Sequence, residues 1–170
     1  MYVLVTSYEG YERTLYRMLT SLGTFRSSGF RGVFVGQVED FKSFMNELEE
    51  KESYSVSRVV PIDVWFTFSK EEFNQKLKDS MASLAERMRP GETFSVKVTR
   101  RGFKGIFSSQ QIASEVGAFV ADLLETHGGF RPRVNLLDPD EAILIETAGP
   151  WCGMGIVSRS LRTRYRLVRW

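Results

Sequence analysis

The sequence contains very little cysteine and histidine. Its 170 residues include one cysteine, Cys152, and one histidine, His127. A disulfide needs two cysteines, and a structural zinc site usually takes four Cys or His ligands, so the chain can form neither by itself. Cys152 follows Trp151 in an apolar stretch, which indicates a buried structural thiol rather than a nucleophile paired with His127.

Long apolar runs and cofactor motifs are also missing. No run approaches the roughly 20 apolar residues that a membrane helix needs, and the N-terminal segment Met1–Glu9 lacks the basic start of a signal peptide. There is no G-x-G-x-x-G, no phosphate-loop lysine and no zinc-deaminase signature, so no cofactor is expected. The hydrophobic content of 42% and charged content of 26% are typical of globular chains. We therefore expect a cytoplasmic globular protein of one medium domain or two small ones.

Positive charge is unevenly distributed along the chain. Residues 1–68 carry seven Lys or Arg against nine Asp or Glu, whereas residues 69–170 carry sixteen against twelve. Two blocks, residues 93–114 and 151–170, contain basic residues and no acid. These blocks indicate a focused anion-binding surface, although a solvated basic face with a frayed tail would give the same composition.

The first 62 residues predict the order β-α-β-β-α-β. The β-branched run Tyr2–Ser7 reads as a strand, and residues 10–22 have helical spacing that ends near Gly23. Residues 24–38 read as two strands joined by a turn, Asp40 is a suitable N-cap for a second helix, and residues 56–62 read as a final strand. This order is the split βαβ, or ferredoxin-like, pattern.

The second half predicts helices packed on a mostly parallel sheet. Ser69 and Glu72 form a capping box before a helix that ends at Pro90-Gly91, and residues 93–99 alternate as a strand. After the loop 100–107, a helix capped by Ser108 or Ser109 carries an apolar stripe as far as Gly128-Gly129. Three further strands are expected, at residues 134–137, 142–147 and 152–157. The link from Asp63 to Phe68 is short and aromatic.

Several fragments of the second half resemble the THUMP RNA-binding domain. They are the run from Thr93 to Gly117, with its basic strand end and Ser-Ser-Gln helix start, and the segment from Val134 to Asp140 before a strand. The segments Ser28–Val33 and Arg58–Pro61 resemble segments of a particular group of THUMP proteins. In that group a ferredoxin-like domain precedes the THUMP domain, and there is no enzyme domain. We therefore expect an α/β (α+β) chain with a ferredoxin-like domain at 1–64, a THUMP domain at 65–158 and a basic tail or edge strand at 159–170.

The resemblance also implies a function. THUMP modules bind the acceptor stem and the 3′ end of tRNA, and the eukaryotic stand-alone members are adaptors that present tRNA to a separate cytidine N4-acetyltransferase. A tRNA, a modification enzyme and no membrane are thus the expected partners. The chain has no room for the methyltransferase, deaminase or thiouridine synthetase domain that many THUMP proteins carry. We expect a non-catalytic protein.

The candidate RNA ligands are cations and helix-start residues. Phosphates are bound by cationic side chains and by the free N–H groups of helix N-termini. By this reasoning the candidates of the second half are Lys97, Arg100, Arg101, Lys104, Ser108, Ser109 and Gln110. Phe103 could stack on a base or anchor its loop. By the resemblance, Arg26, Arg31 and Arg58 could meet the 3′ single strand; alternatively, they pair with Glu39 or Asp63 as surface ion pairs.

Two further questions stay open from the sequence. As a strand, residues 160–167 would place Arg162, Arg164 and Arg166 on one basic face, with Arg162 and Arg164 as further candidate RNA ligands, whereas a disordered polycationic tail is the alternative. The chain could also be an enzyme built around Cys152 or the acids between residues 138 and 146, or a protein-interaction module with a basic surface. The turn Asp138-Pro-Asp140 and the apolar setting of Glu146 favour structural roles for these acids.

Overall fold

The structure is a computed structural model that describes residues 1–51 and 53–170. Its contacts divide the chain into two compact units. We call Met1–Asp63 together with Ser160–Arg169 the first unit, and Val64–Arg159 together with Trp170 the second unit. No helix in these described residues is long and apolar enough to cross a membrane.

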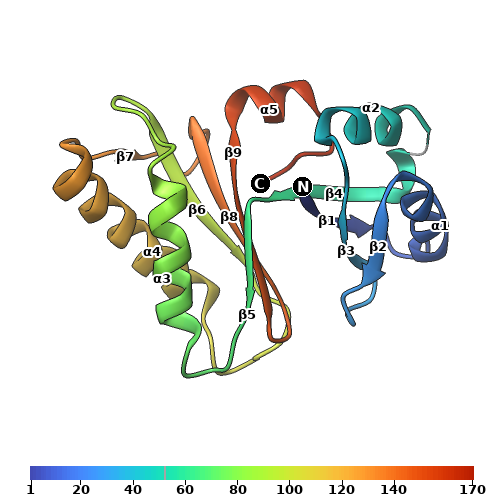
Figure 1. Ribbon diagram of the computed structural model, residues 1–170, viewed down its shortest axis with the longest axis horizontal. Coiled ribbons are helices and arrows are strands. Elements are labelled where there is room, and N and C mark those ends of the chain that lie inside the picture. Colours follow the sequence, from blue (N-terminus) through green and yellow to red (C-terminus); the bar gives the residue numbers. More distant parts are fainter. Residues whose placement is uncertain (52) are drawn as a thin grey trace. The chain divides into compact units, whose positions relative to one another are not determined.

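The first unit contains a four-stranded antiparallel sheet with the strand order β2-β3-β1-β4. Its elements are β1 (Tyr2–Ser7), α1 (Glu12–Leu22), β2 (Thr24–Ser27), β3 (Val33–Gln37), α2 (Phe41–Lys51), the 3₁₀ turn η1 (Ser53–Ser55) and β4 (Val56–Ile62). The predicted β-α-β-β-α-β order is therefore observed, and the sheet has the split βαβ arrangement (Figure 1).

Local chemistry explains the helix starts and the core of this unit. The carboxylate of Asp40 accepts the N–H of Ser43 at 2.7 Å, which is the predicted N-cap of α2. On the sheet, Gly36 leaves room for the ring of Phe25, because a Cβ at Gly36 would lie 2.3 Å from that ring. The Phe25 ring stacks on Phe44 of α2 with 5.8 Å between centroids, which ties helix to sheet.

The C-terminal segment is not a tail. Residues Arg159–Arg164 form a helix, α5, so the expected strand with three arginines on one face is wrong. Beyond it, Tyr165, Leu167 and Val168 are each 2% exposed. The N–H of Val59 donates to the carbonyl of Leu167 at 2.8 Å, and Val168 forms a parallel bridge with Val59 of β4. The red end of the chain therefore covers the β4 edge of the first sheet (Figure 1).

The second unit contains a five-stranded sheet with the order β5-β9-β8-β6-β7. Its elements are β5 (Val64–Thr67), α3 (Phe73–Ala85), β6 (Thr93–Thr99), α4 (Ser109–Leu123), the π-turn η2 (Leu124–Gly128), β7 (Arg133–Val134), β8 (Glu141–Ala148) and β9 (Trp151–Ser158). The prediction of an α/β unit with helices packed on a sheet is confirmed.

This sheet is mixed rather than mostly parallel. β6 runs parallel to β8 and to β7, but β9 runs antiparallel to β8 and to β5. The turn at Gly149-Pro150 is too short for a crossover connection, so β8 and β9 must form a hairpin. The short aromatic link between Asp63 and Phe68 is itself an edge strand, β5, in which half-buried Val64 and Phe66 alternate with exposed Trp65 and Thr67. Its β-branched and aromatic composition is the sequence signal for this strand.

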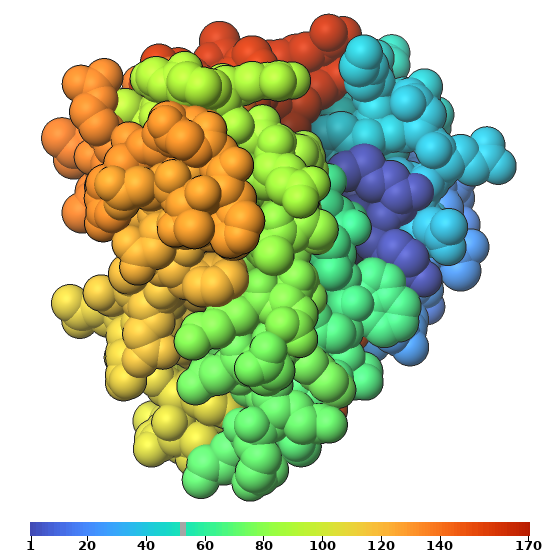
Figure 2. Space-filling view, turned by 60° about the vertical axis from the view of Figure 1, so that its left-hand side comes forward, coloured from blue at the N-terminus to red at the C-terminus, as the bar shows by residue number. Residues whose placement is uncertain are grey.

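Helices α3 and α4 cover one face of the second sheet. Phe73, Leu77 and Met81 of α3 and Val116 and Val120 of α4 are 3% exposed or less. They pack with Ile143 and Ile145 of β8 in one apolar cluster. Figure 2 shows α3 in green beside α4 and η2 in yellow to orange, which together form a continuous face of this unit. At its N-terminal end, α4 starts at Ser109, directly after the loop that follows β6.

Candidate nucleic-acid interface

The loop from Arg100 to Phe107 has an unusual backbone. Gly102, Phe103 and Gly105 adopt positive φ angles of 93°, 51° and 79°. Phe103 is the one residue other than glycine, within 1–51 and 53–170, for which a positive φ is found. A side chain in this region costs about 1–3 kcal/mol, so the surrounding contacts must hold the conformation. The loop is therefore a built feature of the second unit.

Phe103 anchors the loop and does not present a ring for base stacking. Its ring lies 5.4 Å from that of Phe68 and 5.3 Å from that of Phe107, measured between centroids. Phe73 of α3 lies 4.8 Å from Phe107 and 4.5 Å from Phe68. The four rings join the edge of the core, so the open question about Phe103 is settled in favour of packing.

Arg101 is tied to the sheet on three sides. Its Nη1 lies 2.7 Å from Oε2 of Glu146, and the two side chains are 18% and 1% exposed. Its N–H donates to Oγ1 of Thr147 at 3.0 Å, and its carbonyl accepts the N–H of Gly149 at 2.9 Å. Breaking the contact between a guanidinium and a buried carboxylate is strongly destabilising. Arg101, one of the predicted RNA ligands, therefore also fixes the start of the loop.

Arg100 is likewise half-buried and bonded within the loop. Its Nη1 donates to the carbonyl of Gly102, and its Nε is buried with no hydrogen-bond partner in the described part of the chain. The remaining predicted cations of this region, Lys97 and Lys104, are exposed. The Nζ of Lys97 lies 5.9 Å from the ring centroid of Trp170. Lys97 and Lys104 are thus the two lysines that the structure offers to an anion here.

The start of α4 combines a cap with free backbone donors. The hydroxyl of Ser108 accepts the N–H of Gln111 at 3.3 Å, which confirms Ser108 as the N-cap. The first turn of a helix points further N–H groups outward, here those of Ser109 and Gln110, and carries partial positive charge. Ser109 is half-buried and Gln110 exposed. Lys104, exposed in the same loop, precedes the first residue of α4 by five positions.

One exposed residue of this loop was not singled out from the sequence. Ile106 is 49% exposed, beside the equally exposed Lys104 and Gly105. An isoleucine gives no surface signal by type, because the same residue usually marks a core. Only the positions of Phe103 and Phe107, which turn inward on either side, show that Ile106 faces solvent.

The candidate arginines of the first unit have different surroundings. Arg26 on β2 is exposed, and Arg58 on β4 is half-buried. Arg31 is 71% exposed and lies 2.7 Å from Glu12 and 3.3 Å from Glu9. The sequence offered Glu39 or Asp63 as ion-pair partners, but Arg31 pairs with Glu12 and Glu9 instead. Such exposed ion pairs contribute little to stability, and Arg31 stays exposed within them.

The arginines of the C-terminal segment are also not equivalent. Arg162 is half-buried, and the guanidinium carbon of Arg164 lies 5.3 Å from the ring centroid of its neighbour Tyr165. Both belong to α5 and not to a strand. Their expected common face does not form, because Arg162 and Arg164, two residues apart, point in different directions on a helix, and Arg166 lies beyond the helix end.

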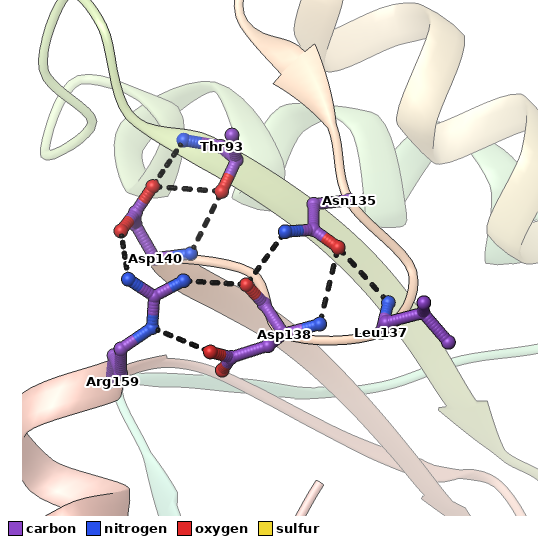
Figure 3. Close-up of polar contacts among 6 residues, drawn as sticks. All are labelled: Thr93, Asn135, Leu137, Asp138, Asp140 and Arg159. Carbon is purple, nitrogen blue, oxygen red and sulfur yellow. Dashed lines mark hydrogen bonds and ion pairs between the residues drawn. The ribbon is translucent and has the colours of Figure 1, made fainter.

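Arg159 holds together the turn that follows β7 (Figure 3). Its Nε lies 3.0 Å from Oδ2 of Asp138, and its Nη1 lies 2.8 Å from Oδ1 of Asp140. Asp140 also accepts the N–H and the hydroxyl of Thr93, at 2.8 Å and 2.7 Å. The Asn135 side chain closes the turn by donating to the carbonyl of Asp138 at 2.7 Å. The acids of this motif are structural, as the sequence favoured.

This network predicts a pH dependence. The N–H of Thr93 lowers the pKa of Asp140 below its usual range, and the Thr93 hydroxyl and the positive charge of Arg159 act in the same direction. A lowered folded-state pKa stabilises the fold above the unfolded pKa of about 3.9, and this contribution is lost as pH falls through the folded value. We expect Asp140→Asn to lower the melting temperature at pH 7, with a difference that shrinks toward pH 2.

Thermal melts from pH 2 to 7 would check this, with Glu71→Gln as a control at an exposed carboxylate. A constant difference between Asp140→Asn and the parent at every pH would contradict the expectation. It would mean that the carboxylate charge is not what stabilises the turn.

Cys152 lies in β9 and is fully buried. Burial raises the pKa of its thiol, and the nearby Glu146 carboxylate raises it further. The thiolate is the nucleophilic form of cysteine, so this environment suits a structural thiol. Within residues 1–51 and 53–170, no group of three His, Cys, Asp or Glu side chains is placed to hold a metal ion.

Comparisons with solved structures agree on the fold. TrmN from Thermus thermophilus superposes with a TM-score of 0.66 at 18% identity over 91% of this chain. PH1313 from Pyrococcus horikoshii Ot3 gives 0.64 at 18% identity over 92%. A 4-thiouridine synthetase, solved as an RNA complex with bound ATP, gives 0.59 at 17% identity over 92%. The matched regions are 44%, 53% and 41% of those three chains, so this chain spans about half of their length or less.

A search of curated protein sequences found no significant match. A model of the THUMP domain matches residues 71–157, just over half of the chain, from just before α3 to the end of β9. The matched residues include β6, the anchored loop 100–107 and the start of α4. This protein therefore belongs to the THUMP family.

Proposed function

We propose that this protein binds tRNA through its THUMP domain and acts as a non-catalytic adaptor for a separate tRNA-modifying enzyme. The observation that carries the proposal is the anchored loop 100–107, which carries the exposed Lys104 and leads directly into the N-terminus of α4, in a chain of the THUMP family. The proposed substrate of the partner enzyme is cytidine, and the proposed reaction is N4-acetylation. The proposed tRNA contacts are the acceptor stem and the 3′ end.

The chemistry of this surface fits an RNA backbone. A phosphate at the start of α4 would accept hydrogen bonds from the N–H groups of Ser109 and Gln110. It would also be attracted by the positive end of the helix dipole. Lys104 adds a mobile ammonium at the loop tip, and Lys97 adds a second positive charge on β6. The likeness to a 4-thiouridine synthetase that was solved with RNA supports the same ligand class.

Charge reversal at Lys104 tests the RNA site. We expect Lys104→Glu to weaken tRNA binding about tenfold and to reduce the slope of log affinity against log salt by about one. The matched control is Lys78→Glu on α3, an exposed lysine outside the loop. Binding would be measured with whole tRNA and with an acceptor-stem minihelix, with and without its 3′ single strand. If both variants weakened binding equally, the RNA would be responding to the overall positive charge of the protein and not to a site at Lys104.

The adaptor role needs a separate test. Purified protein, tRNA and acetyl-CoA would be incubated with and without a cytidine N4-acetyltransferase, followed by nucleoside analysis. The proposal expects N4-acetylcytidine only when the acetyltransferase is present, in an amount that rises with this protein and falls with Lys104→Glu. A product formed without the acetyltransferase would identify this chain as an enzyme. Tight enzyme binding without tRNA affinity would identify a protein-interaction module.

A further inference from the structure

The first unit contains a hollow that the THUMP interface does not explain. Its volume is about 550 Å³, and it is lined by Thr14, Arg17, Met18 and Lys51. Three of these residues come from α1 and the fourth from the last position of α2. Met18 is buried and provides an apolar floor, whereas Arg17 and Lys51 are exposed cations.

Two exposed tyrosines extend the same side of α1. Tyr11 lies three residues before Thr14 and seven before Met18, which places the three on one helix face. Tyr54 follows Lys51 by three residues, and its ring meets that of Tyr11 edge to face, with 5.5 Å between centroids and 77° between planes. The two residues are 43% and 58% exposed. The pair therefore leaves aromatic surface exposed, within three residues along the chain of Thr14 and Lys51, which line the hollow.

The charge around the hollow is available to an anion. Lys51 lies 2.9 Å from Glu47, but both side chains are about half exposed, so this pair is weak and can be replaced. The acids nearest to Tyr11 in sequence, Glu9 and Glu12, are already paired with Arg31. No such acid faces Arg17 among the ion pairs of the described residues.

We propose that this hollow binds one unpaired nucleotide of an RNA strand. The base stacks on the more exposed ring, Tyr54, whose angle of 77° to Tyr11 leaves one base able to lie flat on only one of the two, and a phosphate lies between Arg17 and Lys51. Aromatic rings beside cations are how proteins hold single-stranded RNA, since every base has a face to stack and every link carries a negative charge. This inference rests on the proposed function in one respect: the protein must meet RNA.

The test is binding of a fluorescent single-stranded RNA hexamer to the full chain. We expect Tyr54→Ala and Arg17→Glu each to weaken hexamer binding about tenfold, and Tyr54→Phe to keep it. Lys42→Glu is the matched control, because Lys42 is exposed nine residues before Lys51 and so lies on the opposite side of α2. Circular dichroism melts would confirm that each surface variant is folded.

The outcomes separate this inference from the proposed function. Unchanged hexamer binding in Tyr54→Ala and Arg17→Glu, with tRNA binding still sensitive to Lys104→Glu, would overturn the hollow alone. Loss of the Lys104 effect, with hexamer binding still dependent on Tyr54 and Arg17, would overturn only the THUMP interface. AMP that binds as tightly as the hexamer and competes with it would overturn the assignment to an RNA strand in favour of a free nucleotide.

Discussion

Arg101→Ala is expected to destabilise the second unit by about 3–5 kcal/mol. The change removes the guanidinium that lies 2.7 Å from Glu146 and leaves a carboxylate that is 1% exposed without that partner. A buried charge that loses its counter-charge suffers the full cost of its lost hydration. The expected loss of stability is large because Glu146 stays buried after the substitution, and the burial of its charge, not the strength of the ion pair, determines the cost.

Urea unfolding of Arg101→Ala, Glu146→Gln and the double variant would measure this effect. We expect Arg101→Ala/Glu146→Gln to be more stable than Arg101→Ala, because the double variant no longer buries a carboxylate that has lost the Arg101 guanidinium. A stability of Arg101→Ala within about 1 kcal/mol of the parent would contradict the prediction, since typical surface substitutions fall in that range.

The same result changes how RNA-binding variants are read. A loss of tRNA binding in Arg101→Ala would reflect a displaced or unfolded loop, because Arg101 also anchors the loop through Thr147 and Gly149. Lys104, exposed at the tip, can be changed without disturbing these contacts. A substitution of Lys104 therefore tests contact with RNA separately from the structure of the loop.

Tyr165→Ala is expected to destabilise the first unit by about 3 kcal/mol, which is typical of removing a buried aromatic side chain. Tyr165 is 2% exposed, and its ring packs edge to face on Phe41 of α2 with 6.2 Å between centroids. The loss would open a cavity under the segment that bridges to β4 through Val168. Urea unfolding or thermal melts of the full chain would measure it.

Tyr165→Phe is the matched control. The Tyr165 hydroxyl is buried and has no hydrogen-bond partner among the described residues, so its removal relieves an unsatisfied polar group. We expect Tyr165→Phe to equal or exceed the parent in stability. A loss in Tyr165→Phe as large as that in Tyr165→Ala would show that the hydroxyl, and not the ring, carries the contribution.

The C-terminal segment Ser160–Arg169, which belongs to the first unit, also changes the net charge of that unit. Residues 1–63 carry seven Lys or Arg and nine Asp or Glu, a net charge of −2, and residues 160–169 add four arginines and no acid. The complete unit therefore carries +2. A basic block that reads as a separate tail along the chain is, in space, part of a unit whose own sequence is acidic.

Local signals were sufficient for the element order and for several caps. Hydrophobic periodicity predicted α1, α3 and α4, and side-chain chemistry predicted Asp40 and Ser108 as N-caps, because these features depend on residues within one or two turns. The same local logic failed for residues 160–167. Their alternation fitted a strand, but the segment docks as a helix and a bridge on surfaces formed more than 90 residues earlier.

The sequence by itself determined the THUMP resemblance, the split βαβ order and the basic character of the segment from β6 to α4. Only the tertiary structure decided which cations are free, because Arg101 and Lys104 differ in what lies beside them and not in charge. The partner of Arg101 is a carboxylate 45 residues away. Likewise, the Tyr11 and Tyr54 rings meet through the packing of α1 against η1. Contacts between distant residues set burial, and burial decides whether a charge or a ring stabilises the fold or stays available for a ligand.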